Sequence, residues 1–421
     1  MAAESNSKRT GIVVMLALSG LALTVRLVIV WMYARTTPIL NFFLFGYEPS
    51  HIAAALVNGQ GFSSAFSVHS GPTAWIPPMY PWTIALAFKL FGVFSGGALW
   101  FLLGLNLIFA TATTATIYRI GQRCFTPDVA FGGALLWAVS PDAVAMAVRI
   151  WDIGPATLLA ALVVLWYLRI IQSDPGWKDW IVYGVLWGLS ALVSTTLLAM
   201  LPLPFLVLFL RQHGRFRKQI VAAFAIVILT MTPWTIRNYV RFGRLIPIRG
   251  NFGAELWAGN HPGVQGPADE SVHPLKDKSE LDAYEQMGEA GYVASRQRMA
   301  NAFIRGNPKQ FVELSWERFI SFWSAPLVMS SAWPAACAVL GWAAMILLWW
   351  RKESRPLVTP FAAVILFFPA SYYLSHAESY FRSPVEPLIS LLAVRAFFQC
   401  IELVSPHSAA ASADSPLSAA K

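Results

Sequence analysis

Residues 11–33 read Gly-Ile-Val-Val-Met-Leu-Ala-Leu-Ser-Gly-Leu-Ala-Leu-Thr-Val-Arg-Leu-Val-Ile-Val-Trp-Met-Tyr, and this continuous apolar stretch decides the fold class. A helix needs about 20 such residues to cross the hydrocarbon core of a bilayer. Lys8 and Arg9 stand directly before the stretch, which is too long for the apolar region of a signal peptide, and no Ala-x-Ala cleavage site follows it. We interpret it as an uncleaved membrane anchor whose N-terminus lies in the cytoplasm.

The same kind of segment recurs along the chain. The sequence is 56% hydrophobic and only 13% charged, against about 25% charged in soluble proteins. The apolar segments are continuous rather than alternating, which excludes a transmembrane β-barrel. We therefore predict an all-α polytopic membrane protein with about ten spans. The further spans are expected at residues 98–118, 129–148, 154–171, 180–196, 197–210, 219–236, 333–350, 357–374 and 387–400.

The distribution of charge predicts the topology. The chain has 31 basic and 22 acidic residues, a net charge of +9. Its basic residues gather in alternate short loops, which is the pattern of cytoplasmic loops and not of nucleic-acid binding. These loops hold Arg119 and Arg123, Arg169 and Lys178, the run 211–218, and Arg351, Lys352 and Arg355. We therefore expect both termini in the cytoplasm, membrane lipids as partners and no nucleic acid.

Five regions follow from this topology. Residues 1–10 form a cytoplasmic N-terminus, and residues 11–236 form a membrane module that contains a first outer loop at 34–97. Within that loop the apolar segment 81–94 is too short to cross, so we place it on the outer surface. Residues 237–332 form an outer cap that opens with a Gly/Asn/Trp-rich loop at 251–263 and continues with helices near 279–288, 292–305 and 308–323. The last spans occupy 333–404, and 405–421 is a disordered cytoplasmic tail.

Glu48 is the only charged residue between positions 36 and 88. Pro49 suits the first position of a helix, so one interpretation is a carboxylate stabilised at a helix N-terminus. The other interpretation is a catalytic acid or base at the membrane–water boundary. Its isolation favours catalysis, because Ser or Asn would serve better as a cap. His51 lies one turn later and either shares this site or is a polar surface residue.

Two other outer segments, 70–81 and 251–263, contain residues that can line a pocket. The rigid aromatic turn 70–81 either lines a pocket or anchors a helix at the headgroups, and the 251–263 loop lies closest to the predicted cavity. The candidate pocket residues are Tyr47, His51, Trp75, Pro78, Tyr80, Asn251, Trp257, Asn260 and Glu378.

Two short outer turns also carry charged residues. One holds Asp142, Arg149 and Asp152, and the other holds His376, Glu378, Arg382 and Glu386. Ion pairing within each turn is one explanation. The other is a shared cavity in which carboxylates act as acid, base or metal ligand and arginines hold a phosphate, which suits their forked donors. Zinc-type spacing, a phosphate-binding loop and a Gly-x-Ser-x-Gly elbow do not occur in the sequence.

The chain resembles the polytopic GT-C glycosyltransferases that use lipid-phosphate sugars. This group includes protein O-mannosyltransferases, the lipid A aminoarabinose transferase and bacterial transferases that decorate lipopolysaccharide. The resemblance covers residues 26–395 and rests on the order of short motifs. The motifs are Glu48 with Ala53-Ala-Ala-Leu-Val-Asn-Gly-Gln-Gly-Phe62, Pro77-Pro-Met-Tyr-Pro81, Phe88-Lys-Leu-Phe-Gly92, Asp152, Pro233-Trp-Thr-Ile-Arg-Asn238 with Phe242-Gly243, residues 251–260, and Tyr380-Phe-Arg-Ser-Pro-Val-Glu-Pro387.

The resemblance implies a mechanism and a setting. A polyprenyl-phosphate sugar would donate its sugar, with inversion, to a hydroxyl of a lipid, glycan or protein acceptor. Glu48 would be the general base, Arg382 and Arg149 would hold the donor phosphate, and Asp152 would support them. The resemblance implies no certain cofactor and leaves a divalent cation open, for which Glu48 and Asp152 would be the ligands. The expected location is the bacterial inner membrane, with the active site facing the periplasm.

Two other functions compete with a transferase, namely a transporter or flippase of lipid-linked sugars and a non-catalytic scaffold. A transporter usually places ionisable residues near the middle of the membrane. The predicted spans here carry almost no charge apart from Arg26 and Arg395. Arg26 lies about two turns from the outer end of the first span, where it either extends to the headgroups or contacts an anionic ligand.

Overall fold

The computed structural model describes residues 2–404 except 212–214, 268 and 328–331. The expected disorder of the tail 405–421 therefore lies outside the described residues. The chain is 77% helical, and the described part contains no strand, only one isolated bridge between Ser63 and Pro72. The all-α fold class predicted from the sequence is confirmed.

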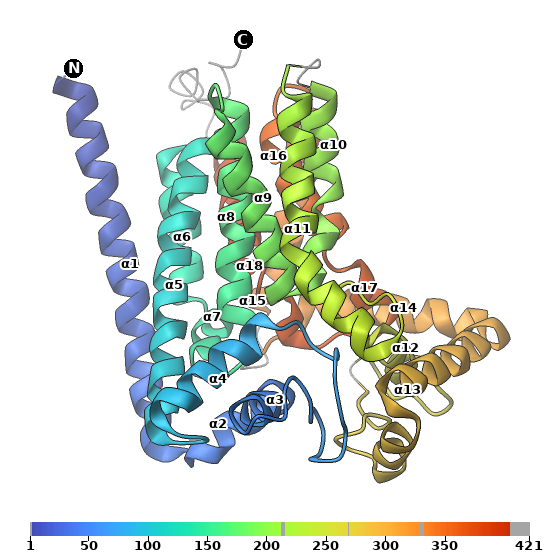
Figure 1. Ribbon diagram of the computed structural model, residues 1–421. Helices are drawn as coiled ribbons and strands as arrows, with labels where there is room; N and C mark the ends of the chain where they lie inside the picture. The colour runs from blue at the N-terminus through green and yellow to red at the C-terminus, as the bar shows by residue number, and fades with distance from the viewer. Residues whose placement is uncertain (1, 212–214, 268, 328–331, 405–421) are drawn as a thin grey trace.

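Long helices form an upright bundle (Figure 1). Its members are α1 (Ala2–Thr36), α5 (Gly96–Cys124), α6 (Pro127–Val139), α8 (Ile153–Gln172), α9 (Trp177–Val193), α10 (Pro202–Arg211), α11 (Arg217–Phe242), α15 (Trp333–Trp350), α16 (Arg355–Leu366) and α18 (Glu386–Val404).

Six of the described helices are long and apolar enough to cross a membrane, or seven if α6 and the bent segment Pro141–Val148 form one span. That segment comprises α7 (Pro141–Ala145) and η1 (Met146–Val148). It is bent by 51° relative to α6. All ten predicted segments fall on helices, but those at α9, α10 and α18 do not meet this test. The predicted number of about ten spans is therefore not confirmed.

Close packing within the bundle depends on small residues. At the contact between α9 and α11, a Cβ added to Gly184 would lie 2.5 Å from the carbonyl oxygen of Ala223, and one added to Gly188 would lie 2.5 Å from Cβ of Thr230. Glycine at these positions lets the two helix backbones approach, as is typical of helix pairs in membranes.

Arg26 lies inside the bundle and does not extend to the headgroups. Its side chain is fully buried and donates a 2.8 Å hydrogen bond from Nη1 to the carbonyl oxygen of Ala138. The guanidinium also lies 4.5 Å from the centre of the Trp137 ring. The snorkelling interpretation is wrong, because the bend after α6 exposes backbone carbonyls that accept these hydrogen bonds.

The chain segments at one end of the bundle are much larger than those at the other (Figure 1). The predicted outer regions all gather at this large end, and the described ends of α1 and α18 point the other way. The large end carries α2 (Ile39–Phe45), α3 (Tyr47–Val57), α4 (Met79–Phe91), η2 (Thr195–Met200), α12 (Phe252–Gly259), α13 (Lys278–Gly306), α14 (Pro308–Ser324), α17 (Ala370–Leu374) and η3 (Ser379–Arg382).

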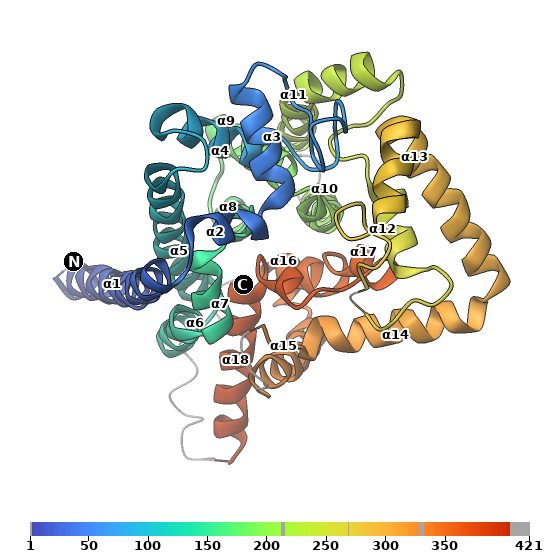
Figure 2. The same cartoon turned by 90° about the horizontal axis from the view of Figure 1, so that it is seen from below.

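The first outer loop and the cap interlock at this end. α4 packs on α3 and α5, whereas α13 and α14 lie on the side opposite α1 (Figure 2). Glu289 of α13 accepts hydrogen bonds from the backbone N–H of Ala74 at 2.7 Å and from the hydroxyls of Thr73 and Tyr284 at 2.5 and 2.7 Å. These bonds hold the segment that carries Trp75 against the cap.

One detail of the predicted cap is corrected by the structure, and its helices are found where they are expected. The expected loop at 251–263 contains the helix α12, because its central residues Ala254, Glu255, Leu256 and Trp257 tolerate helical backbone and bury their apolar side chains. The two helices expected at 279–288 and 292–305 are present as the two parts of α13, which are separated by a kink at Gly288, whose non-helical φ of 65° favours glycine. The helix expected at 308–323 is confirmed as α14.

Candidate functional site

A cavity of about 390 Å³ lies at the large end of the bundle, where the first outer loop, the cap and the turn after α17 converge. Its walls combine aromatic rings with acidic, histidine and arginine side chains. The lining residues used below are Glu48, Trp75, Tyr80, Asp152, Arg249, Asn251, Glu255, Asp269, Glu270, His273, Tyr372, His376 and Tyr380.

Glu48 lies in the first turn of α3 and is buried. Burial disfavours the charged carboxylate and raises the pKa of Glu48 to about 7. The nearby carboxylates of Glu255 and Glu270 raise this pKa further, whereas the Arg249 guanidinium opposes them. A carboxyl with a pKa near 7 is suited to proton transfer at neutral pH.

Asp152 is the second carboxyl of the cavity and precedes the first residue of α8. Burial raises the pKa of Asp152 to about 7, against the lowering effects of Arg249 and of a hydrogen bond with Ser194. The hydroxyl of Tyr80 is buried and makes no hydrogen bond to any described residue, and the Asp152 carboxylate contributes to the raised pKa of Tyr80. Tyr80 therefore offers a polar group to whatever fills the cavity.

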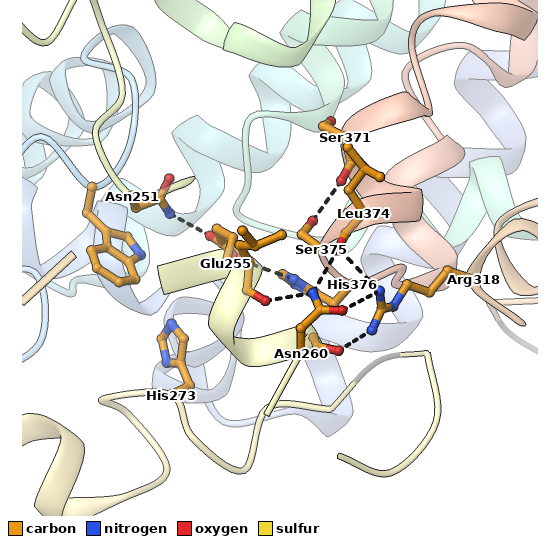
Figure 3. Close-up of polar contacts among 12 residues, drawn as sticks. Asn251, Glu255, Asn260, His273, Arg318, Ser371, Leu374, Ser375 and His376 are labelled. Atoms are coloured by element: carbon orange, nitrogen blue, oxygen red, sulfur yellow. Dashed lines mark hydrogen bonds and ion pairs between the residues drawn. The ribbon is translucent and has the colours of Figure 1, made fainter. Parts of the chain in front are cut away.

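Arg249 is the arginine of the cavity (Figure 3 shows its partner Glu255). Its Nη2 lies 2.6 Å from Oε1 of Glu255, and its Nε donates a 3.0 Å hydrogen bond to the carbonyl oxygen of Trp75. Asn251 also donates to Oε1 of Glu255, and Nδ1 of His376 lies 3.3 Å from Oε2.

Glu255 is ionised by these neighbours. Burial alone would raise its pKa, but His376, Arg249 and His273 together bring the pKa of Glu255 below its ordinary value. One ionised carboxylate thus joins the segment before α12 to the turn after α17.

Asn260 and Arg318 join the same elements from outside the cavity (Figure 3). Asn260 is fully buried, and its Nδ2 donates to the carbonyl oxygens of Leu256 and Leu374 at 2.7 and 2.9 Å. Arg318 of α14 donates to the carbonyl oxygens of Gly259 and Leu374. These donors satisfy the carbonyls at the ends of α12 and α17, so Asn260 supports the cavity wall rather than lining it.

The predicted pocket residues separate into two groups. Trp75, Tyr80 and Asn251 line the cavity together with Glu48 and Asp152. The structure does not bring the others to the lining, namely Tyr47, His51, Pro78, Trp257, Asn260 and Glu378.

Tyr47 and His51 contact each other instead of the cavity. Their rings stack with centroids 4.0 Å apart, and the Tyr47 hydroxyl donates to the carbonyl oxygen of Phe66 at 3.1 Å. Because α3 presents a different face to the cavity, His51 does not share the site with Glu48 although it lies one turn away.

The two arginines expected to hold phosphate also lie elsewhere. Arg382 is 2% exposed and donates to the carbonyl oxygen of Phe322 at 2.5 Å. Its Nη2 lies 3.8 Å from carboxylate oxygens of Asp142 and Glu386, so ion pairing accounts for these three residues. Arg149 is half-buried, and its backbone carbonyl accepts a 2.9 Å hydrogen bond from Asn106. Arg249 is instead the arginine that lines the cavity.

Arg249, Glu255, Glu270 and His273 are among the cavity residues that the sequence-based site omitted, whereas His376 belongs to an outer turn that the sequence analysis considered. Arg249 lies just before the motif at 251–260, and Glu255 lies within it. This motif was the feature of the sequence that could have identified both residues. His273 had none, because it lies in an irregular segment of the cap whose position depends on how the cap folds back over α3.

A divalent cation finds no ready set of ligands here. Within the described parts of the chain, no three histidine, cysteine, aspartate or glutamate side chains are placed to hold a metal ion. Glu48 and Asp152 line one cavity, but the third ligand that a protein cation site normally needs would have to come from substrate or water.

Comparison with known proteins agrees with this architecture. Residues 76–236 match the model of the dolichyl-phosphate-mannose-protein mannosyltransferase family. The archaeal oligosaccharyltransferase AglB from Archaeoglobus fulgidus, solved with an inhibitory peptide and a dolichol-phosphate, matches with a TM-score of 0.56 at 13% identity, over 96% of this chain and 52% of that chain. The same protein solved with zinc and sulfate matches with a TM-score of 0.55 at 14% identity, over 97% and 52%.

The other comparisons gave a weaker structural match and no sequence match. ArnT from Cupriavidus metallidurans, solved with undecaprenyl phosphate, gives a TM-score of 0.42 at 14% identity over 97% of this chain and 80% of that chain, too low to support an argument. No curated protein sequence matches the chain. The chain spans about half the length of the oligosaccharyltransferase chains that it matches.

The chain is a multi-pass membrane protein. Its fold is that of the oligosaccharyltransferase. Its segment 76–236 is similar to the dolichyl-phosphate-mannose-protein mannosyltransferases. This segment begins in the aromatic turn of the first outer loop and ends within α11.

Proposed function

We propose that the chain transfers a sugar from a polyprenyl-phosphate donor to an acceptor hydroxyl in the cavity at the large end of the bundle. The observation that carries this proposal is the pair of buried carboxyls, Glu48 and Asp152, each with a pKa of about 7, in one cavity with Arg249. A transferase of this kind needs a proton acceptor for the hydroxyl and a cation for the phosphate, and the cavity provides both.

Glu48 is the general base in this mechanism. Its ionised carboxylate accepts the proton of the acceptor hydroxyl while the oxygen attacks the anomeric carbon of the sugar. The bond from that carbon to the phosphate oxygen breaks, the lipid phosphate leaves with the electron pair, and the attack from the opposite face inverts the anomeric centre. The main work of the cavity is to position the two reactants and to stabilise the developing charge.

Arg249 takes the phosphate-binding role in place of Arg382 and Arg149. A guanidinium in a partly enclosed cavity matches the geometry of phosphate oxygens, and Arg249 is held in place by the Trp75 carbonyl and by Glu255. Asp152 supports this region through its charge interaction with Arg249. With Glu48 it would also provide the protein ligands of any divalent cation, which would neutralise charge on the leaving phosphate.

The proposed partners and location rest on the similar structures and on the charges of the loops. The solved relative AglB was captured with a dolichol-phosphate and an inhibitory peptide, which supports a lipid-phosphate donor and leaves a lipid, glycan or protein as acceptor. We propose the bacterial inner membrane as the location, with the cavity facing the periplasm. The end of the bundle opposite the cavity carries the basic loops, and such loops remain in the cytoplasm.

A transporter or flippase of lipid-linked sugars is the alternative. In the described helices, Arg26 is a charge buried in the bundle, and its hydrogen bonds go to backbone carbonyls in a region separate from the cavity. The ionisable groups that line the cavity lie at one end of the bundle and not at its middle, which favours a transferase over a transport pathway.

The deciding experiment supplies purified protein in lipid vesicles with labelled polyprenyl-phosphate sugars and candidate acceptors. Transfer of label to an acceptor is expected, and the rate in Glu48→Gln should fall by about 10²–10⁴-fold because glutamine cannot accept the proton. Glu313→Gln, at an exposed position of α14, is the matched control and should keep the wild-type rate. Movement of intact labelled lipid across the vesicle without transfer would favour a flippase instead.

A further inference from the structure

His273 occupies a fixed position beside Glu48. It belongs to the irregular segment between α12 and α13, and it is enclosed by the rings of Phe66 and Trp75, which meet the imidazole edge-on at centroid distances of 5.5 and 5.8 Å. Its Nε2 lies 3.9 Å from Oε1 of Glu48. The aromatic walls leave the imidazole little freedom to rotate, so the nitrogen that faces Glu48 is determined by the fold.

The backbone determines which nitrogen of His273 carries the proton. The N–H of Leu275 donates a 3.2 Å hydrogen bond to Nδ1 of His273. An imidazole nitrogen that accepts a hydrogen bond is unprotonated, so in the neutral ring the proton is on Nε2. The protonated nitrogen of the imidazole is therefore the one that lies 3.9 Å from Oε1 of Glu48.

We propose that His273 is a positioning residue for Glu48, and that it acts as a neutral imidazole that donates its Nε2–H to the carboxylate. This inference rests on the proposed function, in which Glu48 is the base. A separation of 3.9 Å is longer than a hydrogen bond, and such contacts in unliganded sites often tighten when substrate binds. The donor would orient one carboxylate oxygen and leave the other to accept the proton of the acceptor hydroxyl.

A neutral donor suits this role better than a cation. Burial lowers the pKa of His273, the carboxylates of Glu255 and Glu270 raise it, and His376 and Lys276 add smaller lowering contributions. Protonation at Nδ1 would also break the hydrogen bond from Leu275. A neutral imidazole orients the carboxylate without forming an ion pair, so Glu48 keeps the basicity that it needs.

The other charged groups around Glu48 do not replace this donor. Glu255, Glu270 and Arg249 interact with Glu48 through charge alone, and Arg249 already donates to Trp75 and Glu255. The Tyr47 hydroxyl, whose pKa is raised by burial and by Glu48, donates to the Phe66 carbonyl. His273 is thus a neutral donor beside this carboxylate, and the Tyr380 hydroxyl, whose pKa is raised by burial and by carboxylates that include Glu48, lines the same cavity.

The tautomer is tested without any substrate. Protein labelled with ¹⁵N-histidine in lipid is measured by solid-state NMR at pH 7.5, and the His273 signals are assigned by their loss in His273→Gln. One protonated Nε2 and one unprotonated Nδ1 are expected. A ring protonated at Nδ1, whether neutral or cationic, would overturn the inference even in a protein with full transferase activity.

Paired substitutions test the role in catalysis. The amide nitrogen of glutamine reaches the position of Nε2, whereas that of asparagine stops near Nδ1. His273→Asn should therefore lose about 10- to 100-fold in transfer rate at pH 7, the effect of one hydrogen bond to a charged group, and His273→Gln should recover much of it. Without the donor the pKa of Glu48 rises, so the loss in the Asn variant should shrink at higher pH.

The controls separate the inference from the proposed function. His69→Gln changes an exposed histidine of the same outer end and should behave as wild type. Equal losses in the Asn and Gln variants at every pH would show a merely structural role. If the wild-type protein transfers no sugar, the proposed function fails, and infrared titration of the Glu48 carboxyl still tests the inference, because its pKa must be higher in His273→Asn than in wild type.

Discussion

Nη2 of Arg249 lies 2.6 Å from Oε1 of Glu255 inside the cavity, and the other oxygen of the same carboxylate lies 3.3 Å from Nδ1 of His376. The phosphate-binding cation that we propose is therefore already paired before any donor arrives. Its partner belongs to α12, so donor binding and the position of the cap are physically linked through one carboxylate. A phosphate that enters must share the guanidinium with Glu255.

Arg249→Ala is expected to weaken use of the polyprenyl-phosphate donor by about 10- to 100-fold in kcat/KM, the effect of losing one hydrogen bond between charged groups. Arg249→Lys should restore only part of this, because an ammonium lacks the forked donor geometry. The measurement is the donor dependence of the transfer rate in vesicles.

Two companion variants decide whether the effect is electrostatic or structural. Arg244→Ala removes an exposed arginine of the same segment, which contacts the backbone of Ala290, and should leave donor use unchanged. Glu255→Gln breaks the ion pair but keeps the cation, so it should not weaken donor binding. A donor defect in Glu255→Gln as large as that of Arg249→Ala would show that the pair only holds the fold.

Arg382→Ala is expected to destabilise the protein without a specific donor defect. The guanidinium is buried with two carboxylates, Asp142 and Glu386, and removing the cation would leave their charge unbalanced, at a cost of about 3–5 kcal/mol. Thermal unfolding in detergent should show the loss, and the exposed Arg351→Ala should not. A normal unfolding temperature with weakened donor binding would return Arg382 to the phosphate site.

The fold could be predicted because its determinants are local. Continuous apolar stretches near 20 residues specify membrane helices by length alone, and the loop charges order them. The number of spans is less secure, because α9 and α10 are short and the helix before Pro141 is bent. The helix α12 was missed because glycines at both ends of 250–263 indicate a loop, whereas burial against α13 stabilises a helix between them.

The site could be predicted only where one residue stood out from its surroundings. Glu48 is an isolated carboxyl in an apolar segment, Asp152 stands directly before an apolar helix, and both line the cavity. Arg382 is as conspicuous in the sequence, but whether its turn faces the cavity or the α14 side depends on tertiary packing. His273 is inconspicuous in a polar segment, and only the folding of the cap over α3 brings it to Glu48.

The topology predicts opposite accessibility for two positions at the ends of α5. Ser95 caps its N-terminus at the large end of the bundle, and Gln122 lies near its C-terminus beside Gly11 of α1. In a protein whose native cysteines are replaced, Ser95→Cys should react with an impermeant maleimide added outside the cell. Gln122→Cys should react only after the membrane is permeabilised. Labelling of the Ser95→Cys variant only from the cytoplasm would contradict the proposed orientation.

The raised pKa of Glu48 predicts that catalysis is obtained at the expense of stability. Its pKa is about 7 in the folded protein against an ordinary value of 4.5, so the folded state binds this proton more tightly than the unfolded state does. Stability from this group is therefore greatest below pH 4.5 and declines as the pH rises toward 7, by about 3 kcal/mol in total. Glu48→Gln is neutral at every pH and should unfold at a higher temperature than wild type at pH 8, with the difference falling to about a quarter of that size near pH 5. Thermal unfolding at the two pH values measures this, and Glu313→Gln, an exposed substitution, should show no such difference. If Glu48→Gln is instead less stable than wild type at pH 8, the carboxylate stabilises the start of α3, and the proposed conflict between basicity and burial at Glu48 does not exist.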